Sequence, residues 1–488
     1  MLASFRFARP FPTLLLAMAF AMLASLPALA EEPAAVEPAA VDVSGAWLGT
    51  LDVGAIKLRL VVKIAQGEDG ALSGSMDSLD QNVSGIPIDE AALNDRELRL
   101  ELKSIQGVFV GALNEAGTEI EGIWSQGPNS LPLVLKKTDE VPVLRRPQEP
   151  QPPLPYRAEE VAYDSRQAGT RLAGTLTVPE GEGPFPAVLL ITGSGAQDRD
   201  EGLLGHKPFL VLADYLTRRG IAVLRVDDRG VGGSTGDFGK ATSQDFAEDV
   251  LGGVDFLKGR GDIKPSNIGL IGHSEGGLIA PLVASRCEDV AFLVLLAGPG
   301  VTGEQILYAQ GELISKAGGA SDELAAQTRA SQEAMFAVVR EVADNDAALE
   351  KLRAAFDNAL ASLDEIARAA VEAQRGVAEQ QMQALVSPWF RFFLAYDPAP
   401  TLQLVKCPVL AVNGEKDLQV PPDQNLPVIA AALAAGGNTD FAVRELPGLN
   451  HLFQTSETGA PAEYGLIEET FSPAALEIVG DWIEDRVR

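Results

Sequence analysis

Short runs in which apolar and polar residues alternate are the main pattern between residues 41 and 140. Clear examples are residues 57–64, 97–102 and 131–135, and glycine, asparagine or aspartate stands between them. Alternation places the apolar side chains on one face of a strand, and the intervening residues are typical of turns. The pattern predicts a small all-β domain, either an antiparallel barrel or a sandwich.

The pattern changes after a proline-rich stretch at residues 141–157, whose composition favours an extended, semi-rigid linker. From residue 158 to 488 the apolar runs are short and continuous, as is typical of parallel strands buried on both faces. An antiparallel pair at residues 161–164 and 170–179 should open this sheet. The later runs are residues 186–191, 221–226, 268–271, 291–296, 408–412 and 441–446. They predict a second domain of the α/β class.

Apolar residues at helical spacing characterise the stretch from about 301 to 400, which separates two predicted strands of the second domain. They include Met335, Val338, Val339 and Val342, and then Leu349, Leu352, Phe356, Leu360 and Leu363. The spacing predicts a helical insertion that caps the carboxyl ends of the strands. Its last part, residues 388–396, is rich in aromatic side chains. That richness favours packing between cap and core, with an apolar substrate pocket as the alternative.

The first thirty residues have the pattern of a secretory signal peptide. Arg6 and Arg9 precede an apolar run at residues 14–26, and small residues follow up to Ala30. The run is short for a membrane span of about 20 residues, and no cysteine follows the cleavage point to carry a lipid. We therefore expect cleavage near Ala30, export to the periplasm or the medium, and no stable membrane insertion afterwards.

Composition narrows the classes of partner. The chain has 488 residues, of which 46% are hydrophobic and 22% charged, as is typical of a soluble globular protein with more than one domain. Its net charge of −29 should repel nucleic acid and anionic lipid. The three histidines are scattered without clustered ligands, so we expect no metal site and no cofactor.

A serine on a sharp strand-to-helix turn is the most informative local feature. The sequence Gly272-His273-Ser274-Glu275-Gly276 follows an apolar strand and precedes a helix-like stretch at residues 277–284. Glycines two residues to either side let the backbone turn tightly enough to expose the serine hydroxyl, and the next N–H, that of Glu275, is free to bind an oxyanion. A helix N-cap would not need these glycines. Ser274 is therefore the candidate nucleophile.

The candidate acid follows the predicted strand at residues 408–412. Asp417 lies in the loop at the carboxyl end of this strand, where open α/β sheets hold their active sites. Glu415 and Asp423 are the competing carboxylates, since a loop acid can be merely solvated. We favour Asp417.

The candidate base is His451, in the loop after the predicted strand at residues 441–446. Of the other histidines, His206 precedes the serine turn and His273 occupies the variable position within it. Only His451 completes the chain order serine, acid, histidine.

These motifs resemble the α/β-hydrolase superfamily, and in particular the EstD-type bacterial carboxylesterases and serine-aminopeptidase-like hydrolases, over residues 159–488. Residues 186–201 look like the third strand and oxyanion loop of that family, and residues 221–234 look like the next strand and its glycine-rich turn. The resemblance implies an α/β-hydrolase sheet with a helical cap. It also implies that Cys287 and Cys407 lie near each other on neighbouring strands. Whether they form a disulfide is left open.

The resemblance implies an oxyanion hole made of two backbone N–H groups. One belongs to Glu275. For the other we favour Ser194, with Gly193 and Gly195 as alternatives, because Thr192 stands where many relatives have histidine.

The activity implied is that of an exported serine carboxylesterase acting on a small ester with a short or medium acyl chain. His451 would take the proton of Ser274 as it attacks the carbonyl, Asp417 would orient the imidazole, and water would release the acyl group. An aminopeptidase, amidase or thioesterase with the same triad is the first alternative. A non-enzymatic binding protein acting through the β domain is the second.

Overall fold

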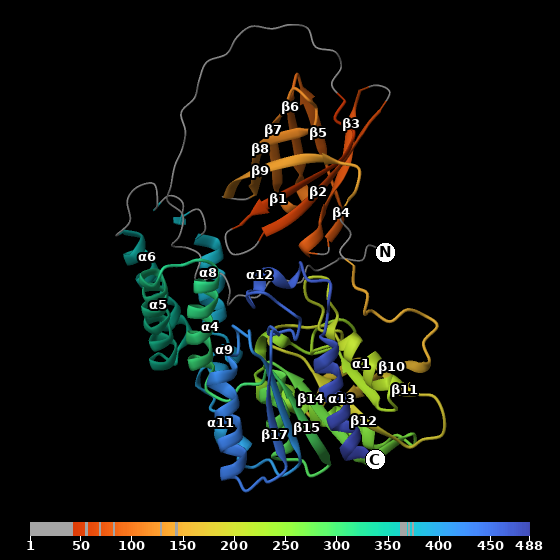
Figure 1. The fold of residues 1–488 in the computed structure, drawn as a ribbon. Coiled ribbons are helices and arrows are strands. Elements are labelled where there is room, and N and C mark those ends of the chain that lie inside the picture. Colours follow the sequence, from red (N-terminus) through yellow and green to blue (C-terminus); the bar gives the residue numbers. More distant parts are fainter. Residues whose placement is uncertain are drawn as a thin grey trace. The chain divides into compact units, whose positions relative to one another are not determined.

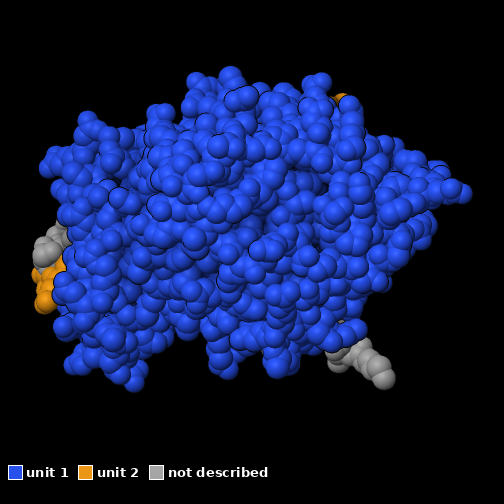
Figure 2. Space-filling model, turned by 90° about the horizontal axis from the view of Figure 1, so that it is seen from below, with its two compact units in different colours: residues 1–17, 146–356, 379–488 blue, residues 18–145, 357–378 orange. Residues whose placement is uncertain are grey.

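The computed structural model describes most of the chain after residue 41. The described residues are 42–53, 57–67, 70–81, 83–126, 129–141, 145–361, 368, 371–372 and 375–488. The predicted signal peptide and Leu363 lie outside them. The described chain forms two compact units, shown in separate colours in Figure 2. Unit 1 holds residues 146–356 and 379–488, and unit 2 holds the preceding residues up to 145 together with 357–378.

Unit 2 is built on one antiparallel sheet, with the strand order β4-β3-β2-β1-β9-β8-β7-β6-β5 (Figure 1). The strands are β1 (Gly45–Asp52), β2 (Lys57–Gln66), β3 (Leu72–Ser78), β4 (Val83–Pro87), β5 (Glu90–Asn94), β6 (Glu97–Leu102), β7 (Gly107–Leu113), β8 (Glu119–Gln126) and β9 (Asn129–Thr138). Two single turns, η1 (Leu79–Gln81) and η2 (Lys103–Ile105), lie between strands. Strands β3 and β5 approach each other, so the sheet is nearly closed.

Alternation along the strands of unit 2 produces its core. In β6, Leu98, Leu100 and Leu102 are buried, while the alternating residues Glu97 and Arg99 are exposed. The same face of the other strands contributes further buried residues, among them Trp47, Phe109 and Trp124. The prediction of a small all-β domain is confirmed, and of its two predicted forms, barrel or sandwich, the single nearly closed sheet corresponds to the barrel.

Unit 1 contains a mixed sheet with the order β10-β11-β13-β12-β14-β15-β16-β17. The strands are β10 (Tyr156–Asp164), β11 (Arg171–Pro179), β12 (Phe185–Ile191), β13 (Ala222–Val226), β14 (Ile263–His273), β15 (Val290–Leu296), β16 (Val409–Gly414) and β17 (Phe441–Leu446). Strand β11 pairs antiparallel with β10 and β13, and the remaining pairs are parallel. The α/β-hydrolase sheet and its opening antiparallel pair are therefore as predicted.

Helices cover both faces of this sheet (Figure 1). In β12, Val188 and Leu190 belong to the core that includes α1 (Pro208–Arg218) and α13 (Pro473–Val487). Leu189, which points the other way, lies against α2 (Ser243–Lys258). Three more helices complete the unit: α3 (Gly276–Ala284), which packs with α2, α11 (Pro422–Ala435), which packs on β16 and β17, and the short α12 (Pro461–Tyr464). Burial on both faces explains why the parallel strands are continuously apolar.

Most described residues between β15 and β16 are helical, which confirms the predicted helical insertion. They are α4 (Gly303–Ala317), α5 (Asp322–Glu341), α6 (Asn345–Ala361), α8 (Arg375–Leu385), α9 (Pro388–Ala395) and α10 (Ala399–Leu402). Of the apolar residues predicted for α5, Val339 is buried, whereas Val342 is the residue at which the helix ends. Helix α9 lies against α4 and α5 of the cap and also against α2 and the turn η3 (Phe238–Lys240). The aromatic segment therefore packs between cap and core.

The two cysteines lie near neighbouring strands, because β15 pairs directly with β16. Both are nevertheless free thiols. Burial raises the pKa of Cys407 to about 12, so this thiol stays protonated and unreactive at neutral pH.

Side chains from the proline-rich stretch hold it on unit 1. The Arg146 guanidinium donates to the carbonyls of Leu204, Gly205, Gly465 and Ile467. The side-chain amide of Gln148 donates a hydrogen bond to the Phe471 carbonyl and accepts one from the Thr470 N–H. Within the described residues, no helix has the length and apolar character that a membrane span requires.

His206 links the loop before α1 to the segment around α12, and its burial makes the fold sensitive to acid. Its Nε2 contacts the Tyr464 carbonyl at 2.8 Å, and its Nδ1 contacts the Thr470 hydroxyl at 2.9 Å. A neutral ring with its proton on Nε2 satisfies both contacts. Burial, helped by the nearby charge of Arg146, lowers the pKa of His206 to about 4.

The depressed pKa of His206 predicts that the unfolding free energy of the protein depends on pH. An unfolded chain binds the His206 proton at about pH 6.5, before the folded chain does, so the stability from this residue is complete above that pH and is lost as the pH falls to about 4. We expect this loss to reach about 3 kcal/mol of unfolding free energy. Urea unfolding of the wild type and His206→Gln at pH 7.5 and 4.5 should show a weaker pH dependence in the variant. Equal pH dependence would contradict the prediction.

Candidate active site

Ser274 occupies a strained turn between β14 and α3. Its φ angle is +51°, in the left-handed region, which costs about 1–3 kcal/mol for a residue other than glycine. The flanking glycines are required by close backbone packing: a Cβ on Gly272 would lie 2.0 Å from the Gly276 carbonyl oxygen, and one on Gly276 would lie 2.2 Å from that of Ile191. The Ser274 N–H donates to the Leu296 carbonyl at 2.8 Å. Strands on both sides thus hold the turn.

Asp417 and His451 are hydrogen-bonded to each other. Asp417 Oδ2 and His451 Nδ1 are 2.8 Å apart, and the two residues are only 2% and 4% exposed. Asp417 Oδ1 accepts the N–H groups of Gln419 and Val420 at 2.8 and 2.9 Å, which fix the plane of the carboxylate. With the ring proton on Nδ1, Nε2 of His451 keeps its lone pair.

The competing acids are placed differently. Glu415 is exposed and accepts the N–H of Gly448. Asp423 is exposed in the first turn of α11. Of these three acids, only Asp417 contacts a histidine.

The loop after β12 runs beside the serine. A Cβ on Gly193 would lie 3.3 Å from Ser274 Cβ. The Gly193 N–H donates to Glu201 Oε1 at 2.7 Å, so it is already occupied. The N–H groups of Ser194 and Glu275 make no hydrogen bond to any residue that the structure describes. Gly193 is therefore a weaker alternative for the second oxyanion donor, while Ser194 and Gly195 remain predictions.

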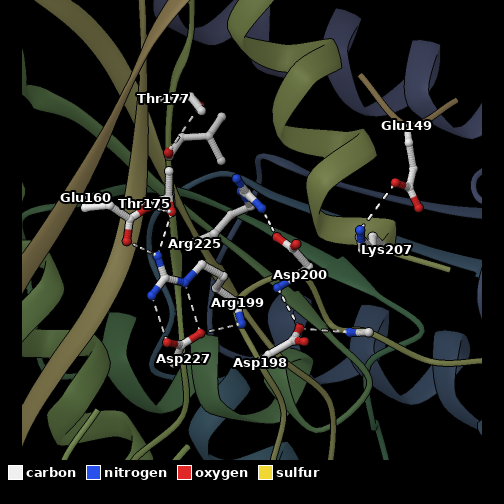
Figure 3. Close-up of polar contacts among 12 residues, drawn as sticks. Glu149, Glu160, Thr175, Thr177, Asp198, Arg199, Asp200, Lys207, Arg225 and Asp227 are labelled. Carbon is white, nitrogen blue, oxygen red and sulfur yellow. Dashed lines mark hydrogen bonds and ion pairs between the residues drawn. The ribbon is translucent and has the colours of Figure 1, made fainter. Parts of the chain in front are cut away.

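Carboxylates at the end of β13 hold this loop in place. Asp228 accepts the Thr192 hydroxyl at 2.8 Å and the Gln197 N–H at 2.9 Å, and burial raises the pKa of Asp228 well above its usual range. Figure 3 shows the guanidinium of Arg199 between Asp227 and Glu160. The backbone N–H of Arg199 also donates to Asp227. The loop is therefore anchored at both ends.

The cap contacts the residue that follows the serine. The buried Glu275 carboxyl accepts the Ser243 hydroxyl at 2.6 Å and the Trp389 indole N–H at 2.8 Å. Burial raises the pKa of Glu275. Trp389 comes from α9 and stacks on Phe393, with 5.3 Å between the ring centroids. The aromatic segment of the cap thus reaches the serine turn.

His273 and Glu201 are site residues that sequence reasoning missed. His273, set aside as the variable position of the motif, contacts Glu201 Oε1 through Nδ1 at 2.9 Å and the His451 carbonyl through Nε2 at 3.0 Å. Sequence alone offers no signal that pairs two residues separated by 72 positions. Among the described residues, no group of three or more histidine, cysteine or acidic side chains could hold a metal ion.

Comparison with known proteins gives a family and partial relatives. Residues 168–435 match the model of the X-Pro dipeptidyl-peptidase (S15) family. The chain is 34% identical to esterase EstD of Thermotoga maritima over 151 residues, which are 31% of this chain and 36% of that protein. It is 36% identical to the putative hydrolase YtaP of Bacillus subtilis in an alignment 132 residues long that covers 23% of this chain and 43% of that protein. The chain thus spans less than half of the length of these two curated relatives.

Solved structures give similar matches. The α/β-hydrolase GrgF from a Penicillium species is 18% identical, with 68% of this chain and 99% of that chain covered and a TM-score of 0.43. The esterase Pf2001 of Pyrococcus furiosus is 14% identical, with 72% and 100% covered and a TM-score of 0.41. Because the family match covers more than half of the sequence and the sheet of unit 1 has the α/β-hydrolase order, the chain belongs to the X-Pro dipeptidyl-peptidase (S15) family of α/β-hydrolases.

Proposed function

We propose that the protein is a serine carboxylesterase that uses Ser274, His451 and Asp417 to cleave small acyl esters. The observation that carries the proposal is the buried hydrogen bond between Asp417 and His451, in a loop that contacts the strained turn of Ser274 through His273. A nucleophile, a base and an orienting acid are the three roles that acyl transfer requires.

The proposed reaction has two steps. His451 Nε2 takes the proton of Ser274 as Oγ attacks the ester carbonyl, and the N–H groups of Glu275 and Ser194 stabilise the oxyanion. The intermediate collapses when the His451 imidazolium protonates the leaving alcohol. Water, activated by His451, then attacks the acyl-enzyme, which releases the carboxylic acid and regenerates Ser274.

Two features favour esters over peptides. The cap brings the partly exposed indole of Trp389 to the serine turn, which suits an apolar acyl chain. The nearby carboxyl group of Glu275, which could otherwise bind the amine of a peptide, already accepts bonds from Ser243 and Trp389.

The family match is the observation that favours the second candidate, a dipeptidyl-peptidase acting after X-Pro. The N-terminal pattern supports the further proposal that the enzyme acts outside the cytoplasm.

A pair of chromogenic substrates tests this choice. We expect kcat/KM for p-nitrophenyl butyrate to exceed that for Gly-Pro-p-nitroanilide by at least about 100-fold, since a site shaped for an apolar acyl group leaves the dipeptide amine unpaired. A series of p-nitrophenyl esters from acetate to dodecanoate would then give the acyl length. Faster cleavage of the anilide would favour the peptidase. Absence of turnover with both substrates would favour a binding role for the β domain.

A further inference from the structure

The ring of His273 lies between two oxygen acceptors. Its Nδ1 contacts the Glu201 carboxylate at 2.9 Å, and its Nε2 contacts the backbone carbonyl of His451 at 3.0 Å. A neutral imidazole carries one N–H and can donate to only one of them. The Glu201–His273 pair therefore shares one extra proton, as an imidazolium and a carboxylate with no net charge. Burial is the largest single influence and lowers the pKa of His273. The charges of Glu201 and Asp417 and the hydrogen bonds to Glu201 and to the His451 carbonyl together outweigh it, so the pKa is raised.

The pair connects the two loops that flank the serine. Glu201 Oε1 also accepts the Gly193 N–H at 2.7 Å, in the loop that carries the expected oxyanion donor. A continuous path of hydrogen bonds thus runs from Gly193 through Glu201 and His273 to the backbone of His451. Glu201 and His273 are only 5% and 6% exposed, so solvent cannot replace these bonds.

We propose that Glu201 and His273 are positioning residues that hold the oxyanion loop and His451 around Ser274 and that set the basicity of His451. The inference rests on the proposed role of His451 as general base. Neither residue needs to touch the substrate.

The effect on basicity is electrostatic. The rings of His273 and His451 are 4.8 Å apart between centroids, close enough for a change in the charge of the pair to reach the base. Other groups face the same region: Asp417 contacts His451 and influences His273, Asp228 interacts with Glu201, and the Tyr464 hydroxyl contacts the His451 backbone. None of these groups is replaced in the variants that test the pair.

A variant that removes the His273 imidazolium but keeps the Glu201 carboxylate should change the charge next to His451. In His273→Gln, the Glu201 carboxylate has no compensating charge, and this negative charge favours the imidazolium form of His451. The base must be neutral to act, so the acid limb of the kcat/KM profile should move to higher pH. In the double variant Glu201→Gln/His273→Gln, the negative charge is gone as well, and the limb should return.

The experiment compares the full-length wild type, each single variant and the double variant. The kcat/KM for p-nitrophenyl butyrate is measured from pH 5 to 9, with thermal unfolding as the check that each variant folds. We expect the limb of His273→Gln to lie about one pH unit above that of the wild type. We expect the limb of Glu201→Gln to stay near the wild-type position, because burial then leaves His273 neutral, and the limb of the double variant to do the same.

Two outcomes would overturn the inference. One is a His273→Gln enzyme with reduced kcat and an unmoved acid limb, as packing alone would produce. The other is a shift that persists in the double variant, because it could not then come from Glu201. Failure of the proposed function would look different, since the wild type would show no Ser274-dependent turnover and no limb to move.

Discussion

Ser274→Ala should reduce ester turnover by on the order of a millionfold in kcat, because the oxygen that forms the acyl-enzyme is removed. The fold should survive the change. Alanine keeps the Cβ that serine already places at a φ angle of +51°, so the strained turn becomes no more demanding. The initial burst and the steady-state release of p-nitrophenol from p-nitrophenyl butyrate measure the two chemical steps separately.

The matched control for this variant is Ser285→Ala. Ser285 lies just after α3, and among the described residues its hydroxyl bonds only the Leu282 carbonyl, so its loss should leave turnover unchanged. A fluorophosphonate probe should label the wild type and Ser285→Ala but not Ser274→Ala. Equal turnover in the wild type and Ser274→Ala would refute the proposed nucleophile and direct attention to the β domain.

Asp417→Asn should lower kcat near neutral pH by about 10⁴-fold, because the geometry forces His451 into the wrong tautomer. The N–H groups of Gln419 and Val420 both point at Oδ1, so the asparagine must place its carbonyl oxygen there. Its NH₂ group then faces His451 Nδ1, which has to accept a hydrogen bond. The ring proton moves to Nε2, and the lone pair that should receive the Ser274 proton is lost.

The control for this variant is Asp423→Asn, which removes the charge of an exposed acid on α11 that contacts neither His451 nor the serine turn. Its kcat should equal that of the wild type. Both variants can be compared by kcat/KM for p-nitrophenyl butyrate between pH 6 and 9. A loss of less than about tenfold in Asp417→Asn would instead favour Glu415, in the same loop, as the orienting acid.

The parts of the site that sequence could predict are those fixed by sheet topology. Parallel strands end at one edge, so residues that follow buried apolar runs gather there, and Asp417 after β16 and His451 after β17 do so. The turn at Ser274 was predictable for a different reason, since its glycines are required by contacts within a few residues and with the next strand. The fold class was predictable from the alternating or continuous apolar runs of the strands and from the helical spacing of apolar residues in the insertion.

The remaining contacts depend on the three-dimensional packing of side chains and of long loops. Glu201 is an acid in a loop rich in acids, and only its approach to Gly193 and His273 distinguishes it. Trp389 was expected to pack between cap and core, but a hydrogen bond from its indole to Glu275 requires the final angle of α9. No periodicity encodes such angles, because they are set by packing across the whole unit.

The insertion of the cap between two hydrogen-bonded strands has an evolutionary consequence. Leu296 at the end of β15 lies opposite Val412 of β16, so the helices between these strands leave the sheet and return to it at adjacent strands. The loop-closure cost of such an excursion grows only slowly with its length. Helices can therefore be lengthened, lost or exchanged there without disturbing the register of the strands that carry the chemistry. Substrate preference is free to diverge between relatives while the catalytic frame is inherited intact.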